Sequence, residues 1–192
     1  MPRCLIIAGP NGAGKTTFAL KRLREIGIRH FINADMIAAG LSPLDPDAQQ
    51  LAASRLFLGQ IEDRMSARED FAFETTLSGR GYLRLIERLQ ATGWAVELVY
   101  LALPSAEMSQ MRVTERVAHG GHNIPPADIE RRFPRSLRNL LNDYSMRVDR
   151  CECYLNGRDR VAIFEVVGGA RVIHHRKFFD WLVKEADRGH GQ

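Results

Sequence analysis

The chain has 192 residues, the size of one domain with room for an inserted lid, and its 45% hydrophobic content is enough for a buried core. Its formal net charge is +4, from 27 basic and 23 acidic side chains. No apolar run approaches the roughly 20 residues needed to cross a bilayer, which argues against a membrane protein, so we expect a cytoplasmic location.

Arginine supplies 23 of the 27 basic residues. Its planar guanidinium pairs well with phosphate, so this bias fits anionic ligands, but it also fits a GC-rich genome, and the sequence leaves both explanations open. Cys4, Cys151 and Cys153 lack the number and spacing of a disulfide scaffold or a zinc site.

The first predicted element is a buried strand over residues 3–8, where the chain is continuously apolar. The next eight residues match the phosphate-loop pattern GxxxxGK[ST], and a helix is predicted from Lys15 to about Ile26, ending before Gly27. The N–H groups of such a glycine-rich loop converge on phosphate at a helix N-terminus. We therefore expect a nucleoside triphosphate to bind here.

Each residue of this loop has an expected role. Lys15 should reach the β- and γ-phosphates, and Thr16 should offer its hydroxyl to Mg²⁺. The residues assigned to nucleotide binding are Gly9, Pro10, Asn11, Gly12, Ala13, Gly14, Lys15, Thr16 and Thr17.

Polar side chains follow the next two predicted strands. A strand over residues 30–35 would place Asp35 at its carboxyl end, and a strand over 71–76 would present Glu74, Thr75 and Thr76. In open parallel sheets, ligands lie outside the carboxyl ends of the strands. A carboxylate in an apolar stretch, such as Glu74, needs a partner because its burial is costly. Asp35 also suits a helix cap, and the two threonines also suit a strand, so these interpretations stay open.

The remaining elements complete the predicted fold. Helices are expected over about 47–68 and 83–92, and a central strand over 95–103; this alternation is typical of βαβ units and a parallel sheet. Strands near 151–155, 161–167 and 171–174, with a tight turn at Gly168-Gly169, predict a C-terminal β-hairpin, and a last helix is expected over 177–186. We therefore predict one α/β domain over residues 1–192, with the three-layer α/β/α fold of P-loop NTPases and a mainly parallel sheet.

A helical lid is predicted over about residues 105–142. One helix carries Arg112 and Arg116, a Gly120-Gly121 loop follows, and a second helix carries further arginines and Pro134, which should kink or interrupt it. The alternative is a solvated helical hairpin whose arginines pair with nearby acids. His122 fits either a lid contact or a plain loop position.

Taken in order, these segments resemble the zeta-toxin family of P-loop kinases. The matching segments span about residues 3–142: Gly9 to Thr17, Asn33-Ala34-Asp35, Phe73-Glu74-Thr75-Thr76-Leu77, Arg112 through Gly120-Gly121-His122 to Arg131-Arg132, and Arg135-Ser136-Leu137. The resemblance implies a kinase that uses ATP or GTP with Mg²⁺. The best-known members phosphorylate a hydroxyl of UDP-N-acetylglucosamine and are neutralised by an antitoxin protein.

The resemblance also implies roles for individual residues. Asp35 would be the general base, Lys15 would act on phosphate, and Arg116 with Arg131 or Arg132 would clamp the triphosphate from the lid. The substrate would contact Asp35 and Glu74, with Thr75 and Thr76 beside them.

Other functions remain as alternatives. An ABC-type ATPase shares the loop sequence, but its catalytic acid is missing here because the strand over 95–103 ends at Pro104. A nucleotide-binding regulatory protein would bind nucleotide without phosphoryl transfer. Nucleic acid is disfavoured as a partner, because residues 112–150 hold eight arginines against five acids, short of a basic stripe.

Overall fold

The computed structural model describes residues 1–121, 123–157 and 159–188. Its strands form one seven-stranded sheet in the order β2-β3-β1-β4-β5-β6-β7. Their bounds are β1 Arg3–Ala8, β2 His30–Ile32, β3 Phe71–Thr75, β4 Ala95–Ala102, β5 Arg150–Asn156, β6 Arg160–Val167 and β7 Ala170–Ile173. The first five are parallel and the last two antiparallel, as the sequence predicts.

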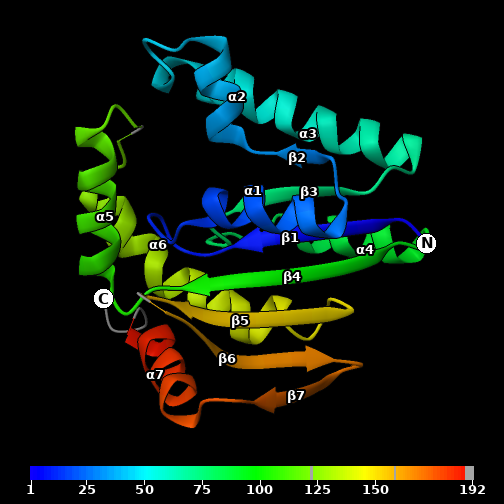
Figure 1. Cartoon of the computed structure of the whole chain (residues 1–192), viewed down its shortest axis with the longest axis vertical. Coiled ribbons are helices and arrows are strands. Elements are labelled where there is room, and N and C mark those ends of the chain that lie inside the picture. The colour runs from blue at the N-terminus through cyan, green and yellow to red at the C-terminus, as the bar shows by residue number, and fades with distance from the viewer. Residues whose placement is uncertain (122, 158, 189–192) are drawn as a thin grey trace.

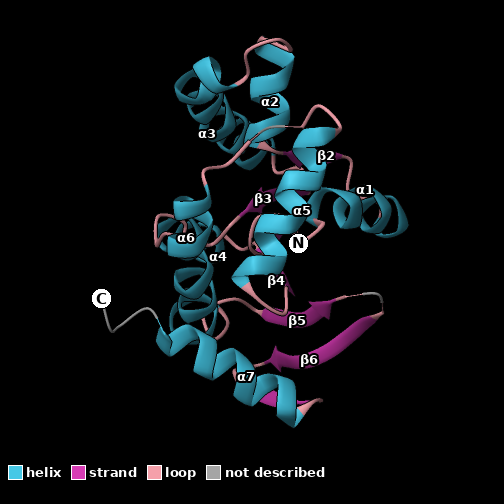
Figure 2. Ribbon diagram, turned by 90° about the vertical axis from the view of Figure 1, so that its left-hand side faces the viewer, coloured by secondary structure: helices cyan, strands magenta, loops and turns pink. Residues whose placement is uncertain are grey.

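Helices cover both faces of this sheet, which gives the three layers of a P-loop fold. They are α1 Lys15–Ile26, α2 Ala34–Leu41, α3 Gln50–Ala67, α4 Leu83–Ala91, α5 Ala106–Ala118, α6 Pro126–Asn139 and α7 Arg176–Asp187, with a 3₁₀ turn η1 Asp47–Gln49 and a π-helical segment η2 Leu140–Tyr144. In Figure 2, α1 lies on one side of the sheet, and α4 and α6 lie on the other. In Figure 1, β1 and β4 point toward α5, which stands at their carboxyl ends. Within the described residues, no helix combines the length and apolarity needed to cross a membrane.

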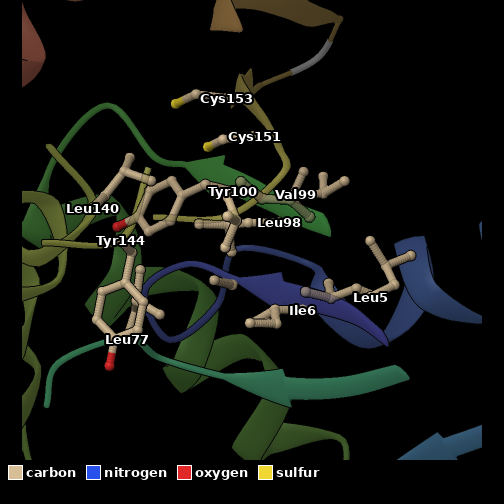
Figure 3. Packing of buried hydrophobic residues seen from close by; sticks show 14 of the residues in the cluster. Leu5, Ile6, Leu77, Leu98, Val99, Tyr100, Leu140, Tyr144, Cys151 and Cys153 are labelled. Atoms are coloured by element: carbon tan, nitrogen blue, oxygen red, sulfur yellow. The ribbon is translucent and has the colours of Figure 1, made fainter. Parts of the chain in front are cut away.

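Strand β1 lies inside the sheet, between β3 and β4, and belongs to the buried core. Leu5, Ile6 and Ile7 are almost fully buried because β1 has neighbouring strands on both edges and helices on both faces. Figure 3 shows Tyr100 and Tyr144 packed beside Leu77 in the same core.

Helix α6 and the segment after it fix the loop that follows β3. Ser136 donates from its hydroxyl to the Thr76 carbonyl, Asn139 Nδ2 donates to the Leu77 carbonyl at 2.8 Å, and Tyr144 donates to the Gly79 carbonyl at 2.9 Å. A buried carbonyl without a partner is costly, so these contacts hold residues 76–79 in one conformation.

One local prediction was wrong, and the interruption allowed for at Pro134 does not occur. Strand β2 ends at Ile32, and Asn33 begins α2 by accepting the Met36 N–H on its side chain at 3.1 Å, so Asp35 lies in the first helical turn and not at a strand end. Helix α6 continues through Pro134 without interruption. Its buried Phe133 and Leu137 hold the helix in place, and this packing outweighs the local cost of proline.

The tight turn after β1 yields the first testable prediction. Gly9 has φ +146°, and a Cβ there would collide with the Leu101 carbonyl oxygen of the neighbouring strand end, whereas Gly27 has φ +76° with open space around it. Gly9→Ala should lower the free energy of unfolding by about 3 kcal/mol or more, and Gly27→Ala by only about 1 kcal/mol. Urea denaturation of both variants measures the difference, and equal losses would contradict the predicted clash.

Candidate functional site

The phosphate loop joins β1 to α1 at the carboxyl edge of the sheet. Gly12 and Gly14 have φ of +74° and +76°, a region that other residues adopt only with strain, and Gly14 is the residue before α1. Lys15 is buried, and its ammonium donates to the Pro10 carbonyl at 3.1 Å. The Lys15 side chain therefore folds back over the phosphate loop.

Three successive carbonyls of the loop accept hydrogen bonds from other elements. Ser109 Oγ of α5 donates to the Asn11 carbonyl at 2.5 Å, Arg112 Nη1 lies 3.4 Å from the Gly12 carbonyl, and Asn156 Nδ2 of β5 donates to the Ala13 carbonyl at 2.7 Å. In a trans peptide, the following N–H points opposite to the carbonyl. The N–H groups of residues 12–14 therefore point away from these contacts. That of Ala13 donates to the Pro10 carbonyl at 3.2 Å, so the N–H groups of Gly12 and Gly14 are the ones oriented for phosphate binding.

Helix α5 also lies too close to Gly12 for a larger side chain at that position. A Cβ on Gly12 would lie 2.9 Å from Arg112 Cβ and 3.1 Å from the Ser109 carbonyl oxygen. Sequence analysis gave Ser109 and Asn156 no role, because both reach the loop from distant parts of the chain.

Glu74 is the centre of a polar network at the start of α1. Its Oε2 accepts from Thr16 Oγ1 at 2.7 Å and from Asn33 Nδ2 at 2.8 Å, and its Oε1 lies 3.5 Å from Lys15 Nζ. The sequence assigned Glu74 to the substrate, but these contacts place it beside the two loop residues expected to handle phosphate and metal. Asn33 is an additional site residue, and its position in the Asn33-Ala34-Asp35 segment was its only signal.

The electrostatics of Lys15 follow from this network. Burial lowers the pKa of its ammonium below the usual value, while the charges of Glu74 and then Asp35 act in the opposite direction. Arg116 of α5 is close enough to lower it further. Lys15, Glu74, Asp35 and Arg116 therefore belong to one electrostatic cluster around the phosphate loop.

Arg116 is positioned by the glycine pair after α5. The Gly121 N–H donates to the Arg116 carbonyl at 2.9 Å, and a Cβ on Gly121 would lie only 2.5 Å from Arg116 Cγ. A larger residue at 121 would displace this arginine. His122, whose role the sequence left open, lies outside the described residues.

A cavity of about 460 Å³ lies beside the phosphate loop. It brings together three residues singled out by the sequence: Asp35 from α2, Thr76 from the end of β3, and Arg132 from α6. Its full lining is Asn11, Asp35, Asp47, Gln50, Thr76, Asn123, Ile124, Pro125, Asp128 and Arg132. Thr75 is not among these residues, and its hydroxyl accepts the Leu77 N–H at 3.1 Å instead.

The two neighbouring arginines of α6 face different cavities. Arg132 lines the cavity beside the loop, whereas Arg131 lines a separate one next to α7. Both bind Asp128, Arg131 at 2.7 Å and Arg132 at 2.9 Å, and they hold the pKa of that carboxyl below its usual value. The local pairing expected of a solvated hairpin therefore occurs on α6, while α5 contacts the phosphate loop.

This fold and loop define a P-loop nucleotide-binding protein. The chain belongs to the AAA domain family, whose model matches residues 5–132. An uncharacterised protein of Haemophilus influenzae is 27% identical over 131 residues, covering 68% of this chain and 92% of that protein. An adenylate kinase of Carboxydothermus hydrogenoformans is 36% identical over 72 residues, 33% of this chain and 34% of the enzyme.

Solved structures agree with the fold. The AvrRxo1-ORF1:AvrRxo1-ORF2 complex with ATP is similar with a TM-score of 0.74 and 16% identity, over 95% of this chain and 63% of that one. A structure of the PezAT toxin-antitoxin system of Streptococcus pneumoniae is similar with a TM-score of 0.63 and 15% identity. The match covers 100% of this chain and 88% of that chain. The resemblance to zeta-toxin-like P-loop kinases is confirmed at the level of the fold.

The Lys15–Glu74 contact leads to a prediction that needs no enzymatic assay. Glu74→Gln removes the largest influence that favours the Lys15 ammonium, so the pKa of Lys15 should fall further and its neutral amine should be more populated at a given pH. Amine acetylation across a pH series measures this, because Lys21, Lys177 and Lys184 are the other lysines in the sequence.

The matched control is Glu25→Gln, an exposed carboxylate on α1 that pairs with Arg22. It should leave Lys15 unchanged. A Lys15 pKa that stays constant or rises in Glu74→Gln would show that Glu74 does not stabilise the ammonium.

Proposed function

We propose that the protein is a kinase that transfers the γ-phosphate of ATP to a hydroxyl group of a small molecule. The observation that carries the proposal is the cavity in which Asp35, Thr76 and Arg132 meet Asn11 of the phosphate loop. A phosphoryl acceptor needs a base, hydrogen-bond partners and a cation near the transferred group, and these residue types supply all three.

Asp35 suits the role of general base. It lies in the first turn of α2, and its carboxylate lines the cavity, where it would accept the proton of the attacking hydroxyl as the oxygen–phosphorus bond forms. Thr76, which follows β3 and also lines the cavity, would orient the acceptor. Helix α6 holds Thr76 in place through the Ser136 contact to its carbonyl.

The phosphate side would use the loop and the lid. The N–H groups of Gly12 and Gly14 and the Lys15 ammonium would hold the triphosphate, while Arg116 and Arg132 would stabilise charge on the transferred group. The Thr16 hydroxyl and the Glu74 carboxylate, 2.7 Å apart, are oxygen ligands suited to Mg²⁺, which usually takes one or two carboxylates together with substrate phosphates. Bound Mg²⁺ would neutralise negative charge on the β- and γ-phosphates.

The relatives support this reaction class by their names. The adenylate kinase acts on a nucleotide, and the AvrRxo1 complex was solved with ATP. The PezAT name makes an antitoxin protein a candidate partner, and the zeta-toxin resemblance makes UDP-N-acetylglucosamine a candidate acceptor. GTP as donor, closure of the lid over about residues 105–142 and a cytoplasmic location stay predictions.

Replacing the base tests the reaction directly. Asp35→Asn should reduce phosphoryl transfer by about 10²-fold or more, because it removes the proton acceptor, while ATP affinity stays near that of the wild type. Product formation and calorimetric ATP binding measure the two effects. Asp63→Asn, near the end of α3 and outside the cavity lining, should leave both unchanged.

Retained transfer in Asp35→Asn would remove Asp35 from the mechanism. Tight ATP binding without transfer to any acceptor would favour the alternative of a regulatory nucleotide-binding protein.

The adjacent arginines of α6 offer a second, matched test. Arg132→Ala should lower the transfer rate by about 10³-fold if its guanidinium stabilises the transferred phosphoryl group. Arg131→Ala removes the same charge and a contact to the same Asp128, yet it should change the rate only a few-fold, because Arg131 lines the other cavity. Single-turnover rates with labelled ATP measure this; the reverse order of effects would assign the role to Arg131.

A further inference from the structure

Two peptide planes of the phosphate loop are followed by glycine and can rotate easily. A peptide plane turns through the ψ angle of one residue and the φ angle of the next, and glycine adopts either sign of φ at little cost. Gly12 and Gly14, with φ of +74° and +76°, follow the Asn11 and Ala13 carbonyls. Their N–H groups, the ones oriented for phosphate, therefore need a contact that holds these two planes in one orientation.

The neighbouring planes of the loop are held by local contacts. The Pro10 carbonyl accepts the Ala13 N–H at 3.2 Å, which fixes the plane between Gly12 and Ala13. The Gly14 carbonyl accepts the Phe18 N–H at 3.0 Å, in the first turn of α1, which fixes the plane after Gly14. The planes before Gly12 and Gly14 are instead held by side chains from distant parts of the chain.

The first of these side chains is Ser109, on α5. A serine or threonine inside a helix often bonds the carbonyl four residues earlier, as Thr114 of the same helix does with the Gln110 carbonyl at 3.0 Å. The fully buried hydroxyl of Ser109 donates to the Asn11 carbonyl at 2.5 Å, 98 residues away in the chain. It therefore holds the plane whose N–H belongs to the next residue of the loop.

The second side chain is Asn156, the last residue of β5. Its Nδ2 donates to the Ala13 carbonyl at 2.7 Å and would lie 3.2 Å from a Cβ on Gly14. In the sheet, β5 is separated from β1 by β4, so this contact reaches the loop from two strands away. It holds the plane that carries the Gly14 N–H.

We propose that Ser109 and Asn156 are positioning residues that direct the N–H groups of Gly12 and Gly14 toward the triphosphate before it binds. The proposal rests on the nucleotide-binding part of the proposed function. In a trans peptide, a carbonyl held from one side keeps the N–H directed to the opposite side. Donors that are already oriented need no reorganisation when the ligand arrives, so they raise its affinity.

Inorganic tripolyphosphate isolates this contribution, because it carries a chain of three phosphates without a nucleoside. Ser109→Ala and Asn156→Ala should each raise the dissociation constants of tripolyphosphate and of ATP about fivefold to tenfold, the range expected for one hydrogen bond. Calorimetric titration of the full chain measures both constants. A variant with unchanged constants removes its residue from the proposal.

The matched controls each lose a side-chain hydrogen bond to a backbone carbonyl elsewhere. Thr114→Ala removes the contact to Gln110 on α5, and Gln90→Ala removes an amide contact to the Arg147 carbonyl at 3.0 Å. Both should leave the two dissociation constants unchanged. Equal weakening in the controls would mean that loss of stability, and not the orientation of the loop, lowers affinity.

The amide signals of the two glycines give a readout that a general loss of stability would not move selectively. In ¹⁵N NMR spectra of the free protein, Ser109→Ala should shift the Gly12 amide more than that of Gly14, and Asn156→Ala should do the reverse. Shifts of the same glycine in both variants, or of neither, contradict the proposal.

The same titrations separate this proposal from the proposed function. If the wild-type chain binds ATP and transfers phosphate while both variants bind as the wild type does, the positioning role is overturned and the kinase stands. If the wild-type chain binds neither ATP nor tripolyphosphate, both are overturned. Weaker binding in both variants, with no phosphoryl transfer by the wild type, supports the positioning role and overturns the kinase.

Discussion

The site depends on one carboxylate. Glu74 offsets part of the cost of burying the Lys15 ammonium, and its second oxygen accepts from Thr16 and Asn33. These partners come from the start of α1 and from the residue that caps α2, while Glu74 itself belongs to β3. The parallel order β2-β3-β1 brings the three segments to the same edge of the sheet. The network can therefore form only after these strands have paired.

Helices α5 and α6 stabilise the site in different ways. Helix α5 packs against the phosphate loop through Ser109 and Arg112 and contributes Arg116. Helix α6 supplies Arg132 to the cavity and also holds the loop after β3, through Ser136 and Asn139. Because one helix contacts both walls of the cavity, any shift of α6 would move Thr76 and Arg132 together.

The family resemblance and the cavity inform different parts of the function. The family match includes the phosphate loop, whose backbone chemistry serves any triphosphate. The cavity beside the loop is lined by residues of α2, η1 and α6, among others. A shared phosphate loop therefore does not imply that the cavity beside it binds the same substrate as in the relatives.

Much of the fold was predictable from the sequence alone. The apolar run before Gly9, the glycines of the loop and the alternation of strands and helices are local patterns, and they correctly predicted α1, the parallel sheet and the C-terminal hairpin. The sequence also named Lys15, Thr16, Asp35 and Glu74. Local patterns could not decide what these side chains touch. Strand order placed Glu74 against Thr16, and the assembled fold brought Ser109 and Asn156 to the phosphate loop. Helix packing turned Arg132, and not Arg131, toward the cavity beside the loop. Contacts between residues far apart in the chain are determined only when the sheet and its helices assemble.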